Sequence, residues 1–143
     1  MKIYTDKGKK NLFTNYDKNI YGWAILKDGT YYAYEDSRVH AYEGSVVFAL
    51  RGSTVIAAKG SKVFAYEGSV VYALRGSVVN AEEGSTVSAG KGSTVHAEEG
   101  STVYAREGSK VYAYEGSKVY ASKGSTVYAE EGSFVNAYKG SRV

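Results

Sequence analysis

An eight-residue repeat without gaps constrains the fold of this chain more than any other feature. Gly-Ser recurs thirteen times at a spacing of eight residues, starting at Gly44. Val stands three positions after each Gly, starting at Val47, and Ala stands two positions further on, from Ala49 through Ala137. A short fixed period of this kind is typical of proteins that stack one structural unit many times.

Each octad, counted from Gly at position one, carries Ser, Val and Ala at positions two, four and six. Alternation of this kind is the period of a β-strand, so these small residues are expected to point inward and the variable residues outward. Gly adopts positive φ readily, which suits a corner between strands. Octads stacked about 4.8 Å apart can pair with the layers above and below. The sequence therefore predicts an all-β fold, a single-chain β-solenoid (β-helix) of octapeptide repeats.

The charged residue at position eight indicates how many octads form one coil. One alternate set is acidic at six of seven sites, namely Glu35, Arg51, Glu67, Glu83, Glu99, Glu115 and Glu131. The other set is basic at five of seven sites, namely Glu43, Lys59, Arg75, Lys91, Glu107, Lys123 and Lys139. Two octads per coil, 16 residues, would place the two sets on opposite edges. A 24-residue coil is the alternative, because it aligns the near-copies 43–53 and 67–77 and avoids stacking like charges. We predict the 16-residue coil.

The chain divides into residues 1–34, an N-terminal capping segment, and residues 35–143, the repeat array. Asp28-Gly29 lies between the apolar segment Ile20–Leu26 and the aromatic segment Tyr31–Tyr34, which predicts a β-hairpin. Such a segment would cover strand edges at the end of the stack. The alternative is a recognition module whose lysines contact an acidic partner, namely Lys2, Lys7, Lys9 and Lys10. At the other end no cap follows the last octad, so an uncapped C-terminal end is expected to contact another copy.

Charge and composition exclude several partners. The net charge is +3, and residues 35–143 hold twelve basic and twelve acidic residues. A neutral array favours neither nucleic acid nor an anionic membrane surface. No apolar run reaches the ~18 residues of a membrane helix, and residues 1–7 lack the apolar stretch of a signal peptide. The sequence leaves the localisation open.

No residue pattern indicates catalysis, a cofactor or a metal. One Ser per octad at an inward position indicates a structural ladder, and a Ser-His-acid site would need a nearby His. His40 and His96 lie seven octads apart, on opposite faces of a 16-residue coil. The chain has no Cys, and the octad differs from the nonapeptide of calcium-binding β-rolls. We therefore expect no enzyme.

Outward tyrosines are the candidate contact residues. Tyr104, Tyr112, Tyr120 and Tyr128 occupy position five of four consecutive octads. In a 16-residue coil they form two stacked ladders, one on each face. Exposed aromatic ladders bind sugars or a second solenoid, whereas the alternative is stacking that only stabilises the sheet. Earlier octads carry Phe48, Ile56, Phe64 and Tyr72 at the same position.

The octads resemble the tandem repeats of bacterial ice-nucleation proteins, which pair a Gly-Ser-Thr-x-Thr-Ala octad with one containing Asp-Ser. Residues 100–105 (Gly-Ser-Thr-Val-Tyr-Ala) and 35–37 (Glu-Asp-Ser) carry this resemblance, which extends over residues 35–143. The chain also resembles octapeptide arrays of phage and bacterial proteins. In the ice-nucleation family, activity is attributed to outward Thr-x-Thr ladders, and no octad here supplies both Thr.

Three functions follow as hypotheses. The first is a non-enzymatic, self-associating scaffold, a homo-oligomer through its aromatic faces or its C-terminal end. The second is a trimeric β-helix of the phage tail-spike or fibre type, in which each chain gives one octad per layer. The third is an ice-active or carbohydrate-binding surface, with a glycan as partner.

Overall fold

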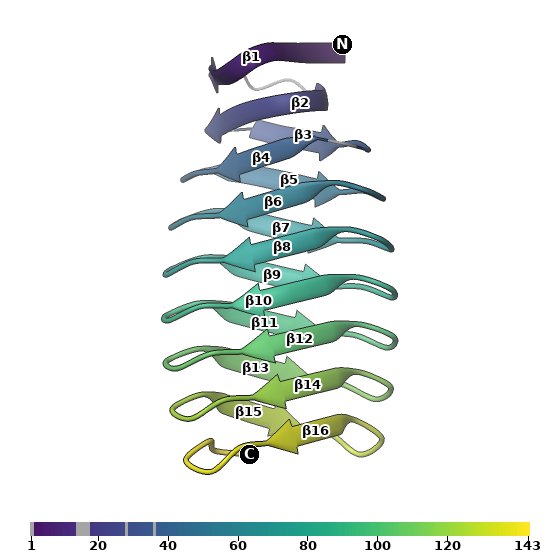
Figure 1. The fold of residues 1–143 in the computed structure, drawn as a ribbon, viewed down its shortest axis with the longest axis vertical. Coiled ribbons are helices and arrows are strands. Elements are labelled where there is room, and N and C mark those ends of the chain that lie inside the picture. Colours follow the sequence, from purple (N-terminus) through teal and green to yellow (C-terminus); the bar gives the residue numbers. More distant parts are fainter. Residues whose placement is uncertain (1, 14–17, 28, 36) are drawn as a thin grey trace.

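A computed structural model describes residues 2–13, 18–27, 29–35 and 37–143, with side chains described for 29–35 and 37–143. These parts hold sixteen β-strands and no helix (Figure 1). The first three strands are β1 (Lys2–Phe13), β2 (Lys18–Lys27) and β3 (Gly29–Ala33). One octad strand follows in each repeat: β4 (Arg38–Ala41), β5 (Ser45–Ala49), β6 (Thr54–Ala57), β7 (Lys62–Ala65), β8 (Val70–Ala73), β9 (Val78–Ala81), β10 (Thr86–Ala89), β11 (Thr94–Ala97), β12 (Thr102–Ala105), β13 (Lys110–Ala113), β14 (Lys118–Ala121), β15 (Thr126–Ala129) and β16 (Phe134–Ala137).

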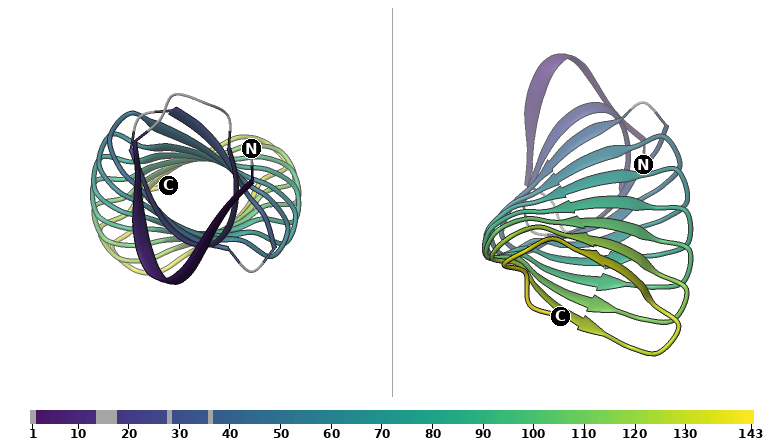
Figure 2. Two further views of the ribbon diagram at one scale, coloured as in Figure 1. Left: turned by 90° about the horizontal axis from the view of Figure 1, so that it is seen from above. Right: turned by 60° about the horizontal axis from the view of Figure 1, so that its bottom comes forward.

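The strands form two parallel walls, and each strand pairs with the strand two places along the chain. The odd-numbered strands from β3 to β15 make the first wall, and the even-numbered strands from β4 to β16 make the second. From β3 to β16 the registers are offset by 16 residues, as in Val87↔Val103 between β10 and β12. Figure 2 shows the successive coils fanned about the long axis. The prediction of a β-solenoid with 16 residues per coil is confirmed, with about seven coils in the stack.

Each corner is a tight turn made by positions seven, eight, one and two. The carbonyl at position seven accepts the N–H of the Ser three residues later, as in Ser101 N to Glu98 O at 3.1 Å. The Gly between them has φ of +73° to +92° from Gly44 to Gly140, which fits the third residue of a type II turn. L-residues with a side chain rarely adopt this φ, so the corner requires Gly.

The buried Ser hydroxyls close the same corners. All thirteen Ser that follow a corner Gly donate Oγ–H to the position-seven carbonyl, at 2.5–2.7 Å. One carbonyl thus accepts from both the backbone and the side chain of one Ser. Ser37, which lies in the octad with Asp at position one, has a buried Oγ without a hydrogen-bond partner. The inward hydroxyls are therefore satisfied by corner backbone rather than by one another.

Adjacent coils contact closely at the corners. From Gly44 to Gly124, each corner Gly donates its N–H to the carbonyl of the Gly one coil later, as in Gly84 N to Gly100 O at 3.0 Å. From Gly52 to Gly140, a Cβ added to the Gly would lie 2.7–3.0 Å from Cγ of the charged residue 17 positions earlier. The aliphatic stems of position eight therefore cover the glycines of the next coil, while their charged ends lie in solvent. Solvent screening explains why stacked like charges, the objection to a 16-residue coil, do not prevent it.

The core consists of small residues between two close walls. Val and Ala at positions four and six are at most 1% exposed from Val39 to Ala121, and the Ser from Ser37 to Ser125 at most 3%. In the first described octad, Tyr31 fills the Val position and is fully buried. The predicted inward set of Ser, Val and Ala is what the walls enclose.

The N-terminal strands differ from the predicted hairpin. β2 pairs in parallel with β3, with Lys18 opposite Tyr31, and its other end pairs in parallel with β4. A hairpin requires antiparallel strands, so the hairpin prediction at Asp28-Gly29 is wrong. Gly29 has a φ of +123° and lies opposite Ser45, because β3 pairs in parallel with β5 one coil later. Gly29 is therefore the first residue of a coil strand and not part of a hairpin turn.

β1 pairs in parallel with β2 at the N-terminal end of the stack (Figure 1). The capping role of residues 1–34 and the boundary at residue 34 stay predictions. The lysines of the alternative recognition module lie outside the residues with described side chains. In the described part of the chain, no helix has the length and hydropathy needed to span a membrane.

Replacing Gly84 by Ala is expected to destabilise the stack. The new Cβ would lie 2.7 Å from Cγ and 3.2 Å from Cα of Glu67, at a φ of +73°. The left-handed conformation alone costs about 1–2 kcal/mol for a residue with Cβ. Urea unfolding followed by circular dichroism measures the loss. Ser88→Ala, at an outward position of the same octad, serves as control and should change the free energy of unfolding by less than about 0.5 kcal/mol. Equal stability of the two variants would show that the corner does not need Gly.

Candidate functional site: two aromatic faces and two charged edges

The outward side of the first wall, which we call the first face, carries a column of rings at position five. Tyr32, Phe48 and Phe64 stack with centroids 5.0–5.1 Å apart. Asn80 interrupts the column, and a second run of rings follows. In that run His96 stacks on Tyr112, and Tyr112 on Tyr128, both at 5.0 Å. The centroid distance in these stacked pairs is close to the distance between neighbouring strands, because a 16-residue coil places equivalent rings on adjacent strands.

The outward side of the second wall, the second face, carries a shorter column. Tyr104 on β12 stacks on Tyr120 on β14 with centroids 5.1 Å apart. Tyr72 stands two coils before Tyr104, and Ser88 lies between them in register with both. Tyr72 and Tyr104 are 45% and 47% exposed. The second face therefore has a gap one ring wide.

The four predicted contact tyrosines form two pairs on opposite faces. Tyr112 and Tyr128 belong to the first face, and Tyr104 and Tyr120 to the second. The structure does not bring all four into one site. Tyr128 is the most exposed of them, at 51%. That these tyrosines contact a partner stays a prediction.

Corner tyrosines extend the first face and were missed at the sequence level. Tyr66 stacks beside Phe48 with centroids 6.3 Å apart, and Tyr114 beside His96 at the same distance. The Tyr114 hydroxyl also lies 3.2 Å from Nδ1 of His96. Both pairs are separated by 18 residues, from position five of one coil to position seven of the next. This spacing is the signal that could have identified them.

Two edges of opposite charge run along the stack where the walls meet. The acidic edge combines positions seven and eight of the first-wall octads, with nine Glu and one Arg for a net charge of −8: Glu35, Arg51, Glu67, Glu82, Glu83, Glu98, Glu99, Glu115, Glu130 and Glu131. The basic edge combines the same positions of the second-wall octads, with six basic residues and two Glu for a net charge of +4: Glu43, Lys59, Arg75, Lys91, Arg106, Glu107, Lys123 and Lys139. The charged residues at position seven thus increase the difference in charge between the two edges that position eight indicated.

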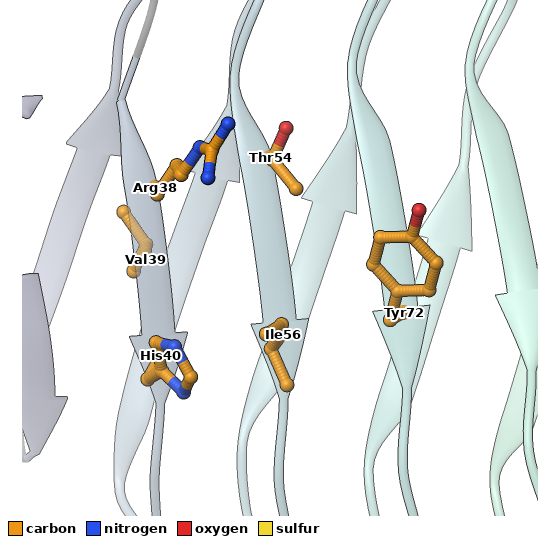
Figure 3. A pocket seen from close by; sticks show the side chains of 6 residues that line it. All are labelled: Arg38, Val39, His40, Thr54, Ile56 and Tyr72. Atoms are coloured by element: carbon orange, nitrogen blue, oxygen red, sulfur yellow. The ribbon is translucent and has the colours of Figure 1, made fainter. Parts of the chain in front are cut away.

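Two hollows lie on the second face. The first, of about 360 Å³, spans β4, β6 and β8, where Arg38 extends toward Thr54 beside Ile56 and Tyr72 (Figure 3). The second is a groove of about 690 Å³ that extends past the Ser88 gap along Tyr104 and Tyr120. Its lining also includes Arg106, Ser122 and Tyr138, which occupy position seven at the corners of this edge.

Candidate catalytic and metal groups are dispersed. His40 lies on β4 of the second wall and His96 on β11 of the first. Among the residues that the structure describes, no group of three or more His, Cys, Asp or Glu is placed to hold a metal ion.

At the predicted C-terminal contact, Phe134 and Val143 are 69% and 65% exposed. Contact of this end with another copy stays a prediction.

No protein-family model matches the chain, and no curated protein sequence matches it either. A solved structure with the same type of fold is a TibC-catalysed hyper-glycosylated fragment of TibA, at 14% identity and a TM-score of 0.52. The alignment covers 98% of this chain and 64% of that fragment. At this identity the likeness shows the β-solenoid fold alone. The resemblance to ice-nucleation and phage repeats stays a prediction.

A double-mutant cycle on Tyr104 and Tyr120 tests whether the ladder stabilises the sheet. The stacked pair is expected to show a coupling of about 0.5–1.5 kcal/mol in the free energy of unfolding when both are replaced by Ala. Tyr104 and Tyr112, on opposite faces, form the matched control and should couple by less than about 0.5 kcal/mol. Urea titrations of the single and double variants give these values. Equal coupling in the two cycles would contradict a stabilising role for stacking.

Proposed function

We propose that this chain is a non-enzymatic structural scaffold, a rigid β-solenoid that associates side by side with further copies of itself. The observation that carries the proposal is the opposite charge of its two edges at one common spacing. The octad coils repeat one 16-residue register, so the two edges are rows of charge with the same period. An acidic edge of one copy can therefore meet the basic edge of the next along the length of the stack.

The geometry of such contacts is heterologous, because two different surfaces of the chain meet. Heterologous contacts produce open assemblies when the rotation between copies does not close a ring. Edge-to-edge association also continues the first and second faces from one copy to the next, so aromatic columns lie in parallel rows. The aromatic faces, which the sequence predicts as self-association surfaces, then form one extended surface over several copies.

The alternative of an intertwined trimer has less support. In that arrangement each chain supplies one octad per layer, and three chains close the layer. Here a single chain supplies both octads of every coil, and its own walls bury Val and Ala completely. The layers need no other chain to enclose their core. Ice activity also has less support, since no octad carries Thr at both outward positions.

Charge reversal at one edge is expected to abolish self-association. The first variant replaces Arg75, Lys91 and Lys123 by Glu. The second replaces five position-eight residues by Lys, namely Glu67, Glu83, Glu99, Glu115 and Glu131, because three changes would leave the acidic edge negative. Both residue types already occur at position eight, where their stems cover the next Gly, so the fold should tolerate them. Each variant then carries two edges of one sign and should remain monomeric in light scattering at low salt, whereas the unmodified chain assembles and dissociates as salt rises.

Mixing the two variants is the decisive measurement, because an all-acidic and an all-basic partner should associate again. The control replaces Lys110 and Lys118, which are exposed on the two faces away from the edges, by Glu. This control should still assemble. The proposal is wrong if the mixture stays monomeric, or if the unmodified chain is monomeric at low salt across protein concentrations.

A further inference from the structure

The groove on the second face is centred on an interruption of its aromatic column. Position five reads Tyr72, Ser88, Tyr104 and Tyr120 over four consecutive coils of this wall. Tyr104 uses one ring face to stack on Tyr120. Its other side borders the Ser88 coil, where the groove opens and where a short side chain replaces a ring.

The width of this gap matches a single six-membered ring. Two strand spacings separate Tyr72 from Tyr104, about 9.6 Å in total. Rings in the existing columns stack with centroids 5.0–5.1 Å apart. A flat ring placed over Ser88 would therefore stack on both tyrosines at the distance that the chain's own rings adopt. We call this space the Ser88 slot.

The surroundings of the slot are polar and basic. Hydroxyls of Thr86, Ser88 and Ser122 line the groove, together with Arg106. Arg75 and Lys91 do not line it, but they are exposed at the corners that follow β8 and β10, on the same basic edge. Hydroxyls pair with a polyhydroxylated ligand, and a guanidinium pairs with a carboxylate through two parallel hydrogen bonds.

A similar gap on the first face has the opposite charge. Asn80 interrupts that column between Phe64 and His96, in register with both. The corners beside it carry Glu82 and Glu98 of the acidic edge. The two gaps thus share ring spacing and differ in charge, so an anionic ligand is favoured at the Ser88 slot and repelled at Asn80.

We propose that the Ser88 slot binds an acidic sugar, a pyranose ring bearing a carboxylate, as in a uronic acid unit of a polysaccharide. The apolar C–H faces of the ring stack between Tyr72 and Tyr104. The carboxylate pairs with Arg106, and the ring hydroxyls bond to Thr86 and Ser88. Neighbouring sugar units continue along the groove over Tyr120. This site shares Arg106 with the basic edge, but binding of a sugar does not require assembly, so the two proposals can be tested independently.

Titration with a galacturonic acid hexamer, followed by calorimetry, tests the slot directly. The unmodified chain is expected to bind it, and Ser88→Tyr to lower the affinity by at least about tenfold because the new ring fills the space. Rings at this position occur in most coils of both walls, so this variant should remain folded. Arg106→Gln should lower the affinity by about threefold to tenfold, as expected for the loss of one exposed charge pair.

Matched controls distinguish the slot from general charge attraction. Asn80→Tyr fills the equivalent gap on the first face and should leave binding unchanged. A neutral galactose hexamer tests the carboxylate, and polyglutamate of similar charge tests the sugar ring; both should bind at least about tenfold more weakly. The proposal is overturned if the acidic hexamer does not bind, if Ser88→Tyr and Asn80→Tyr act alike, or if polyglutamate binds as well as the sugar. Side-by-side assembly is measured separately, by light scattering on the position-eight charge variants, so either proposal can fail while the other holds.

Discussion

The double hydrogen bond at the corners from Ser45 to Ser141 is the interaction on which the rest of the structure depends. A position-seven carbonyl accepts both the N–H and the Oγ–H of one Ser, while Gly between them takes positive φ. This turn uses the same four positions at every corner, so no coil gains or loses a residue. A slip of one residue would exchange the inward and outward side chains of a strand. Uniform corners therefore keep Val and Ala inside, and they align the residues at each outward position of a wall in one column.

Residues 16 positions apart lie next to one another in a column, so similar residues at this spacing form a continuous surface feature. Rings separated by 16 residues stack, as Phe48 does on Phe64, and charges separated by 16 residues form an edge. Alternate octads can then evolve two different surfaces on one uniform core. The core itself offers little chemistry, because its residues are small and its hydroxyls are used by the corners. Within the described octads, the side chains open to a ligand or to another chain lie in the columns at positions three, five, seven and eight.

Most of the fold could be predicted because the inward Ser and Val recur thirteen times, and the inward Ala twelve times, at a spacing of eight residues. The N-terminal strands could not, because Asp-Gly is compatible both with a hairpin and with the start of a coil strand, as at Gly29, which has positive φ and lies opposite Ser45. Nothing local distinguishes the two, since the parallel pairing of β3 with β5 is set by residues 16 positions away. The tyrosine pairs were predictable from spacing alone. The contacts of Tyr66 and Tyr114 were not, because they depend on how a corner side chain turns back over the face.

Interruptions of a column carry more information than the column itself. A continuous ladder, such as Tyr32 to Phe64, buries ring against ring and has a sufficient explanation in sheet stability. At Ser88 and Asn80 that stabilisation is given up, and the adjoining ring faces are left without a ring in the same column. The two interruptions also lie beside edges of opposite charge. A uniform scaffold needs neither feature, whereas a surface that selects a ring-shaped ligand by its charge needs both, so the proposed sugar slot is placed at a gap and not on a ladder.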